Sequence, residues 1–431
     1  MRHPSALLSC VFLLVAVLAI CAQAQTYQVI HNFTGATDGS HPQAGVTIDH
    51  SGSLYATTTA GGYEGGNCAS SGCGAVVKLI QNASGWTVVP LYAFQGGAGG
   101  FLPDAPVMTG PGGALFGTTS AGGVDNNGYG YGTVFSLSPP AHACQSISCP
   151  WTETVLYQFA GLSSGWQPSL GNLTFDPEGN IWGTTMDGGS NGCYGGFGCG
   201  VVFKLTPTQQ GWTETVVYSF TGGGDGAYPV SGVVFDHAGN IYGTTTGGGT
   251  GNCNSYVGGC GVIFKLSPSE NGWAESALYQ FSGGADGGVP VGGLTFSASG
   301  ALYGTTELGG TGNGTVFELA PVGIEWTLNT IYTFPGPGIA GPTANLVLDA
   351  AGNIYGTTLN GPPNYPPCAG SVFELSPSAG VWQYQLLYCF SGGMDGGSPY
   401  SPVTLGANHT LYGTTYSGGA YGDGVVWELT Q

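Results

Sequence analysis

A short motif recurs seven times along this chain of 431 residues, and it constrains the fold more than any other feature. Its clearest copy reads G-N-I-Y-G-T-T at residues 239–245. The aromatic residue at its centre occurs as Tyr55, Phe116, Trp182, Tyr242, Tyr303, Tyr355 and Tyr412. Successive copies are 61, 66, 60, 61, 52 and 57 residues apart. A period of this size predicts repeated supersecondary units that stack and bury a shared core.

Each repeat contains four short apolar segments in a fixed order. In the fourth repeat they are Gly232–Asp236, Ile241–Thr245, Gly261–Leu266 and Trp273–Phe281. A tight turn at His237–Asn240 separates the first two, because Gly and Asn adopt left-handed conformations readily. None of the segments has helical periodicity, so each repeat is predicted to be a four-stranded antiparallel meander.

The seventh repeat lacks a fourth segment, because the chain ends at Gln431, just after the third. A matching segment lies at the other end of the chain, Tyr27–Phe33. An open solenoid would carry capping repeats, whereas a first strand that completes the last repeat requires a closed ring. We therefore predict an all-β fold in which residues 25–431 form one seven-bladed β-propeller of four-stranded antiparallel blades.

These motifs resemble the Gloeo-Verruco (GloVer) tandem repeat of exported bacterial proteins. The shared elements are the repeated G-N-[LI]-Y-G-T-T, the G-[TV]-V-F-[KE]-L strand and the L-Y-x-F strand, and they cover nearly the whole chain after residue 24. The resemblance implies an extracellular location, often with a C-terminal sorting anchor, and no established activity. This chain ends at Thr430-Gln431 without an anchor segment, so we expect release rather than attachment.

The N-terminus also predicts export. Arg2 and His3 precede an apolar run from Leu7 to Cys21, and Ala22–Ala24 forms an A-x-A cleavage site. We interpret residues 1–24 as a secretory signal peptide, since the run is shorter than the roughly 20 residues of a membrane span. A secreted, extracellular monomer without a membrane span is expected, with the periplasm and the cell surface as alternative locations.

Composition excludes several classes of partner. The formal net charge is −19, and only three lysines follow residue 24 against 23 acids in the chain. Nucleic acid and anionic lipid are poor partners for such a surface, because both are bound through clustered Lys and Arg. The 83 glycines suit tight turns, and a hydrophobic content of 42% still allows a large core.

The cysteines after residue 24 fall into five close pairs. An even number in an exported chain predicts disulfides: Cys68–Cys73, Cys144–Cys149, Cys193–Cys199, Cys253–Cys260 and Cys368–Cys389. A structural zinc site is a weaker interpretation, because no His lies within these loops. A hairpin turning between Leu375 and Trp382 would place Cys368 directly opposite Cys389.

The longest loops are predicted to share one face of the ring with the blade-to-blade connections. They are Ala60–Gly74, Ser120–Gly132, Asp187–Gly200 and Gly247–Gly261. Loops on a rigid scaffold commonly bind ligands, so we expect a site on this face and at its central mouth. The candidate ligand-binding residues are loop aromatics that could instead merely cover backbone: Tyr63, Tyr129, Tyr131, Trp166, Tyr194, Phe197 and Tyr256.

Four aspartates occupy equivalent places in the blade-to-blade loops: Asp38, Asp225, Asp286 and Asp395. One hypothesis is that they bind Ca²⁺ together with backbone carbonyls. The favoured interpretation is that each Asp caps its own turn, as Asp commonly does beside Gly. No other cofactor is indicated.

Catalysis has little support in the sequence, and no catalytic residue is predicted. His50, His237 and His409 fall in the tight first turn, on the face opposite the long loops, and no H-E-x-x-H motif occurs. Our leading hypothesis is a secreted binding scaffold for a polysaccharide or cell-envelope glycan. The alternatives are a secreted carbohydrate-active hydrolase or lyase, and a structural extracellular matrix protein.

Overall fold

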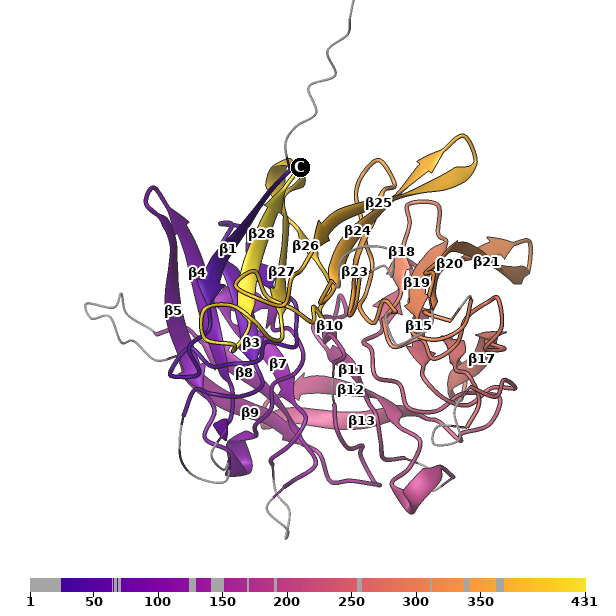
Figure 1. Ribbon diagram of the computed structural model, residues 1–431. Helices are drawn as coiled ribbons and strands as arrows, with labels where there is room; N and C mark the ends of the chain where they lie inside the picture. Colours follow the sequence, from indigo (N-terminus) through magenta and orange to yellow (C-terminus); the bar gives the residue numbers. More distant parts are fainter. Residues whose placement is uncertain are drawn as a thin grey trace, which may run out of the picture.

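The computed structural model describes residues 25–63, 65, 68, 71–123, 129–140, 151–168, 170–189, 192–253, 258–310, 312–336, 341–361 and 368–431. The strands in these ranges form seven four-stranded antiparallel sheets arranged as the blades of a ring (Figure 1). The prediction of an all-β, seven-bladed propeller is therefore confirmed. The predicted signal peptide, the predicted Cys144–Cys149 bond and Tyr256 lie outside the described residues.

Each of the first four blades takes its strands from one continuous stretch of chain. Blade 1 contains β2 (Thr47–Ile48), β3 (Leu54–Thr58), β4 (Ala75–Asn82) and β5 (Gly85–Ala93). Blade 2 contains β6 (Met108–Thr109), β7 (Leu115–Thr119), β8 (Thr133–Ser138) and β9 (Thr152–Gln158). Blade 3 contains β10 (Thr174–Phe175), β11 (Ile181–Thr185), β12 (Val201–Thr208) and β13 (Gly211–Ser219). Blade 4 contains β14 (Val234–Phe235), β15 (Ile241–Thr245), β16 (Val262–Ser269) and β17 (Gly272–Gln280).

The remaining blades follow the same plan, except that the last takes its fourth strand from the N-terminus. Blade 5 contains β18 (Thr295–Phe296), β19 (Leu302–Thr306), β20 (Thr315–Val322) and β21 (Glu325–Thr333). Blade 6 contains β22 (Val347–Leu348), β23 (Ile354–Thr358), β24 (Ser371–Ser378) and β25 (Val381–Cys389). Blade 7 contains β26 (Thr404–Leu405), β27 (Leu411–Thr415), β28 (Val425–Thr430) and β1 (Thr26–Asn32). Short 3-10 turns are η2 (Gly97–Gly99), η3 (Pro111–Gly113), η4 (Tyr194–Gly196) and η5 (Ala407–His409).

The N-terminal strand closes the ring, as the permuted repeat predicts. β1 pairs antiparallel with β28, from Thr26 opposite Thr430 to Asn32 opposite Val425. In Figure 1 the indigo β1 lies alongside the yellow β28. Tyr27 also stacks on Tyr388 of blade 6, with ring centroids 3.9 Å apart, so the strand contacts both of the last two blades.

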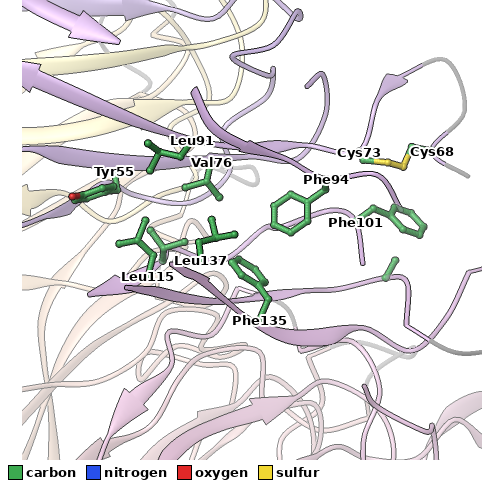
Figure 2. Packing of buried hydrophobic residues seen from close by; sticks show 12 residues of the cluster. Tyr55, Cys68, Cys73, Val76, Leu91, Phe94, Phe101, Leu115, Phe135 and Leu137 are labelled. Atoms are coloured by element: carbon green, nitrogen blue, oxygen red, sulfur yellow. A yellow bond between two sulfur atoms is a disulfide. The ribbon is translucent and has the colours of Figure 1, made fainter. Parts of the chain in front are cut away.

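The core lies between blades rather than within them. Among the described residues, the buried apolar side chains form seven clusters, each shared by two neighbouring blades. Figure 2 shows the cluster between blades 1 and 2, where Phe94 meets Phe135 edge-on at 5.0 Å between ring centroids. Each blade therefore depends on both neighbours for its burial, which couples the whole ring.

The repeated Thr-Thr pair of the second strand joins neighbouring blades. The second Thr donates its hydroxyl hydrogen to the carbonyl two residues later, as Thr245 does to Gly247 at 2.9 Å. The first Thr donates to a carbonyl of the next blade, as Thr357 does to Ser401 at 2.8 Å. Thr414 completes the series by donating to Ala44 across the closure, also at 2.8 Å. These hydroxyls are satisfied by neighbours, as expected for β-branched residues of a buried strand, whereas the hydroxyl of Thr118 has no partner among the described residues.

The glycine of the repeated motif leaves room for an aromatic ring. A Cβ atom on Gly243 would lie 2.5 Å from the ring of Phe264, its partner on the third strand. Blade 1 has Ala56 at the equivalent position, and the residue opposite it is Val77 rather than Phe. The motif accepts Ala only where the facing side chain is smaller, because the interior is close-packed.

Several predicted details differ from the structure, and one is that β16 runs to Ser269, three residues beyond the predicted end of that strand. The first strand of blade 4 is only Val234–Phe235, because Asp236 already starts the turn by accepting the N–H groups of Ala238 and Asn240, both at 2.9 Å. In blade 6, Cys389 lies opposite Ser371, not Cys368, so the predicted register is wrong by three residues. The hairpin turns tightly between Ser378 and Val381, and a register shift follows Val372.

Candidate functional site

The loops between second and third strands lie on the same face as the blade-to-blade loops, as predicted. Single bridges join the two kinds of loop, for example Ser40 with Ala60 and Ala227 with Gly247. We call this side of the ring the long-loop face. It presents the long loops, whereas the opposite face carries the turns between first and second strands and the connections between third and fourth strands.

Disulfide bonds cross-link several loops on the long-loop face. Four of the five predicted bonds are present, namely Cys68–Cys73, Cys193–Cys199, Cys253–Cys260 and Cys368–Cys389. The Cys368–Cys389 bond forms although the predicted register is wrong, because Cys368 precedes β24 in a segment that folds back on β25. There the N–H of Ala369 donates to the carbonyl of Phe390 at 2.7 Å, and the two cysteine Cα atoms are 5.4 Å apart.

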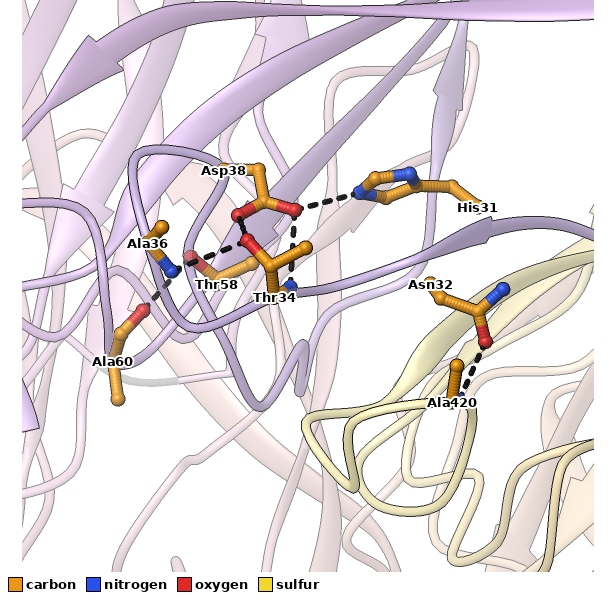
Figure 3. A network of polar contacts seen from close by, with 8 residues as sticks. All are labelled: His31, Asn32, Thr34, Ala36, Asp38, Thr58, Ala60 and Ala420. Atoms are coloured by element: carbon orange, nitrogen blue, oxygen red, sulfur yellow. Dashed lines mark hydrogen bonds and ion pairs between the residues drawn. The ribbon is translucent and has the colours of Figure 1, made fainter.

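The four loop aspartates each sit inside their own turn. In every case the carboxylate accepts the N–H and the hydroxyl of the Thr or Ser four residues earlier. Figure 3 shows Asp38 with Thr34 and with His31, whose Nε2 lies 3.0 Å from Oδ2. Burial opposes ionisation of Asp38, but the hydrogen bonds from His31 and Thr34 bring its pKa below the ordinary value.

These contacts account for the aspartate oxygens without a metal. In the described part of the chain, no group of three or more His, Cys, Asp or Glu side chains is arranged to hold a metal ion. The geometry therefore favours the capping interpretation. Calcium binding by Asp38, Asp225, Asp286 and Asp395 stays a hypothesis that a chelator experiment can test.

Four of the predicted loop aromatics converge on one open pocket of about 470 Å³, which we call the aromatic groove. Tyr129 and Tyr131 come from the β7–β8 loop, Trp166 from the connection between blades 2 and 3, and Phe197 from the β11–β12 loop. Trp166 packs edge-on against both Tyr131 and Phe197, with centroid distances of 5.3 and 5.0 Å. Leu162 completes the apolar lining.

The groove is accessible rather than a closed core. Tyr129 is 74% exposed and Phe197 is 50% exposed, which is unusual for aromatic side chains. Backbone contacts hold Trp166 in place, because its N–H donates to the carbonyl of Asp187 at 2.9 Å. Tyr63 is also exposed, but it lies in blade 1 and does not line the groove; nothing is described of the Tyr194 side chain.

A second hollow lies at the centre of the ring. The sequence predicts a site at this central mouth but identifies none of the residues that line it. The hollow is a cavity of about 210 Å³ at the mouth of the central channel, which we call the mouth cavity. Much of its lining comes from the residue after the proline that ends each blade-to-blade loop. Those described are Gln43, Asp104, Val230, Val291, Thr343 and Tyr400, of which all but Val230 line the cavity.

Two carboxyl groups of the mouth cavity are perturbed by burial. Burial raises the pKa of Asp104 to about 7, and the neighbouring Ser120 hydroxyl and the N–H groups of Asp104 and Leu170 oppose this rise. Burial also raises the pKa of Glu307 above its ordinary value. The sequence contains one signal that could have identified these cavity residues. The residue after the repeat proline differs in chemistry from blade to blade, whereas the rest of the motif is repeated.

Comparison with protein families agrees with this repeat architecture. The model of the Gloeobacter/Verrucomicrobia repeat matches residues 16–256, 129–336 and 311–431, in overlapping segments. The chain belongs to this family. Its four described disulfides indicate an oxidising, extracellular or periplasmic environment. Within the described ranges, no helix is long and apolar enough to cross a membrane.

Solved structures resemble this repeat protein in fold alone. The polysaccharide lyase Uly1 aligns with a TM-score of 0.50 and 12% identity, over 91% of this chain and 90% of that one. A periplasmic gluconolactonase of Pseudomonas aeruginosa, PpgL, aligns with a TM-score of 0.44 and 15% identity, over 82% and 91%. A protein of Lactobacillus plantarum aligns with a TM-score of 0.47 and 13% identity, over 79% and 84%. The comparison with curated proteins gives no match.

Proposed function

We propose that this repeat protein is secreted, with residues 1–24 removed as a signal peptide, and that it binds an extracellular glycan in the aromatic groove. The observation that carries the proposal is the convergence of Tyr129, Tyr131, Trp166 and Phe197 on one open pocket. Exposed aromatic rings are costly to leave in water. A sugar covers such rings with its C–H faces and turns its hydroxyls to the solvent.

The groove has the architecture of a binding site for an extended ligand. Its rings come from two neighbouring blades and from the connection between them, so a chain can lie across the blade junction. The edge-on packing around Trp166 fixes the rings before any ligand arrives. Such preorganisation reduces the entropy lost on binding.

Charge favours a neutral glycan over an anionic one. The groove is lined by aromatic, aliphatic and glycine residues and by no Lys or Arg. The protein carries a net charge of −19, which repels polyanions. We therefore expect neutral polysaccharides to bind better than polyuronates.

The test is affinity electrophoresis of the chain 25–431 through gels that contain neutral or acidic polysaccharides, with calcium and with a chelator. A retarding polysaccharide should lose at least about tenfold in affinity with Tyr129→Ala, since one stacking contact is worth roughly 1.4 kcal/mol or more. Tyr421→Ala is the matched control, because Tyr421 is 65% exposed in the loop before β28, away from the groove.

The same samples separate the alternatives. Depolymerisation of a retarding polysaccharide, measured by new reducing ends or by unsaturated products, would favour a hydrolase or lyase over a binding protein. The carboxyl groups of Asp104 and Glu307 in the mouth cavity are the acids that such an enzyme could use. Absence of retardation by every polysaccharide would contradict the proposal and favour a structural matrix protein.

A further inference from the structure

The mouth cavity contains polar atoms that the protein itself leaves unpaired. Asp104 as a whole is partly exposed, but its Oδ1 is buried and has no hydrogen-bond partner among the described residues. The hydroxyl of Thr343, on the far side of the ring in blade 6, is also buried without a partner in the described ranges. Buried polar atoms are almost always paired, so these two need a ligand or ordered water.

The other polar side chains of the cavity add free donors and acceptors. The Oδ1 of Asn345 accepts the N–H of Gly293 at 2.6 Å, which leaves the Nδ2 hydrogens of Asn345 as free donors. Gln43 and Asn172 line the same cavity, and neither side chain has a hydrogen-bond partner in the described part of the protein. The cavity thus offers donors and acceptors from several blades around one space.

The chemistry of the lining favours an uncharged ligand over an ion. No Lys or Arg lines the cavity, and Asp104 and Glu307 would repel an anion. A hard cation needs several oxygen ligands, but the amide oxygen of Asn345 is already engaged, so that residue would present hydrogens to the ion. An uncharged ligand whose groups both donate and accept satisfies every free atom, and hydroxyl groups have this property.

The size and shape of the mouth cavity further restrict the class of ligand. The cavity of about 210 Å³ has room for on the order of seven waters at roughly 30 Å³ each. Leu170, Val291 and Leu359 form apolar parts of its wall. Such a wall suits a ring that carries hydroxyls on its rim and C–H groups on its faces.

We propose that the mouth cavity binds one uncharged sugar unit through Asp104, Thr343 and Asn345. This site is separate from the aromatic groove, and it does not rest on the function proposed for that groove.

The regular spacing of the repeat is interrupted beside the mouth cavity, in the connection between blades 2 and 3. The strand β10 begins six residues after Pro168, whereas the first strand of every other blade begins five residues after the equivalent proline. The extra residue places Leu170 at a φ of 54° and brings its N–H to the carboxyl group of Asp104. It also interrupts the Thr–carbonyl series, since Thr118 is the one motif threonine without a partner among the described residues.

The experiment is saturation-transfer NMR and calorimetry on the chain 25–431, with D-glucose, D-mannose and D-galactose as probes. At least one of these hexoses should bind saturably. Thr343→Val keeps the side-chain shape but removes the hydroxyl, so it should weaken that hexose about tenfold while preserving or raising the melting temperature. Asp104→Asn should retain binding within about threefold, because an amide both donates and accepts, whereas Asp104→Leu should lose about tenfold or more.

Controls make each result decisive. D-Galacturonate differs from D-galactose by one carboxylate and should bind at least about tenfold more weakly. Tyr421→Ala should leave hexose binding unchanged. The proposal is wrong if no hexose binds, if Thr343→Val has no effect, or if the cavity instead binds Ca²⁺ in a manner abolished by Asp104→Asn. Loss of hexose binding in Tyr129→Ala but not in Thr343→Val would place the sugar in the groove, which supports the proposed function and overturns the mouth site.

Discussion

The second strands and the mouth of the ring are built from the same seven repeats, yet they behave in opposite ways. All five residues of every second strand are buried, from β3 to β27, and their sequences are nearly identical. Five of the described residues after the repeat proline line the mouth, and they are an amide, an acid, a valine, a threonine and a tyrosine. Packing against the neighbouring blade restricts the first set, and no such packing restricts the second.

The difference follows from symmetry. A blade must fit both neighbours, so six of the seven second strands carry Gly beneath an aromatic ring, and all seven carry the Thr pair. A small ligand on the axis has no sevenfold symmetry. A site at the mouth can therefore form only where the repeats stop being equal, and the extra residue before β10 is one such place.

The most severe test removes the strand that closes the ring. Deleting residues 25–33 strips blade 7 of β1, removes the buried Phe33 and leaves β28 as an open edge. Because the core lies between blades, we expect loss of cooperative folding of the whole molecule. Circular dichroism melting is the measurement, with the chain 25–431 as control. A deletion variant that melts like the control would show that the ring does not need its N-terminal strand.

The comparison predicts unequal costs for substitutions in the two regions. Phe203→Ala should destabilise the protein by about 3–5 kcal/mol, since Phe203 is fully buried over Gly183. Gln43→Ala at the mouth should change stability by less than about 0.5 kcal/mol. Urea unfolding measures both. Equal effects would mean that the mouth residues are as tightly packed as the repeated strands.

The disulfides should contribute according to the length of chain that they close. In the chain-entropy model the Cys368–Cys389 bond, with a separation of 21, is worth about 3 kcal/mol. The Cys68–Cys73 bond, with a separation of 5, is worth about 2 kcal/mol. Paired Cys→Ser variants in urea test this order. A smaller loss for the first pair would indicate that the loop before β24 holds its place without the bond.

The sequence was sufficient for the architecture because the repeat period and the permuted last strand are both local, countable patterns. It also predicted the long-loop face and the loop aromatics on it, but not that four of them meet in one groove. The mouth cavity was not predictable, because Asp104, Thr343 and Asn345 come together only when the ring closes. The register of blade 6 failed for a different reason: the tight turn between Ser378 and Val381 moves the pairing by two residues, and the shift after Val372 moves it by one more.

A change of pH should alter the stability of the protein through carboxyl groups of the repeated strands. This is the smallest of the expected effects on stability. Burial raises the pKa of Glu214 and Glu275 to about 7; the hydroxyl of Tyr157 donates to Glu214 at 3.3 Å, and the charge of Asp225 adds to the effect on Glu275. A carboxyl group whose pKa rises on folding stabilises the protein fully below its unfolded value of about 4.5, and this contribution is lost as the pH rises through 7.

The loss of stability at low pH comes from the turn aspartates. Burial opposes ionisation of Asp49, but hydrogen bonds from Ser51, Ser53 and Tyr55 lower its pKa to about 2, so its stabilising contribution is lost as the pH falls below about 4. The melting temperature should therefore be highest near pH 4–5 and decline toward pH 8.

Variants identify the groups responsible for the decline. Glu214→Gln cannot ionise, so it should flatten the fall in melting temperature between pH 5 and pH 8 by part of its extent. Glu270→Gln, in the exposed turn between β16 and β17, changes the net charge equally and is the control. If both variants flatten the curve to the same degree, general repulsion among 23 acidic residues explains the decline. If only Glu214→Gln does so, the cause is the burial of carboxyl groups between blades, a property of the packed repeat.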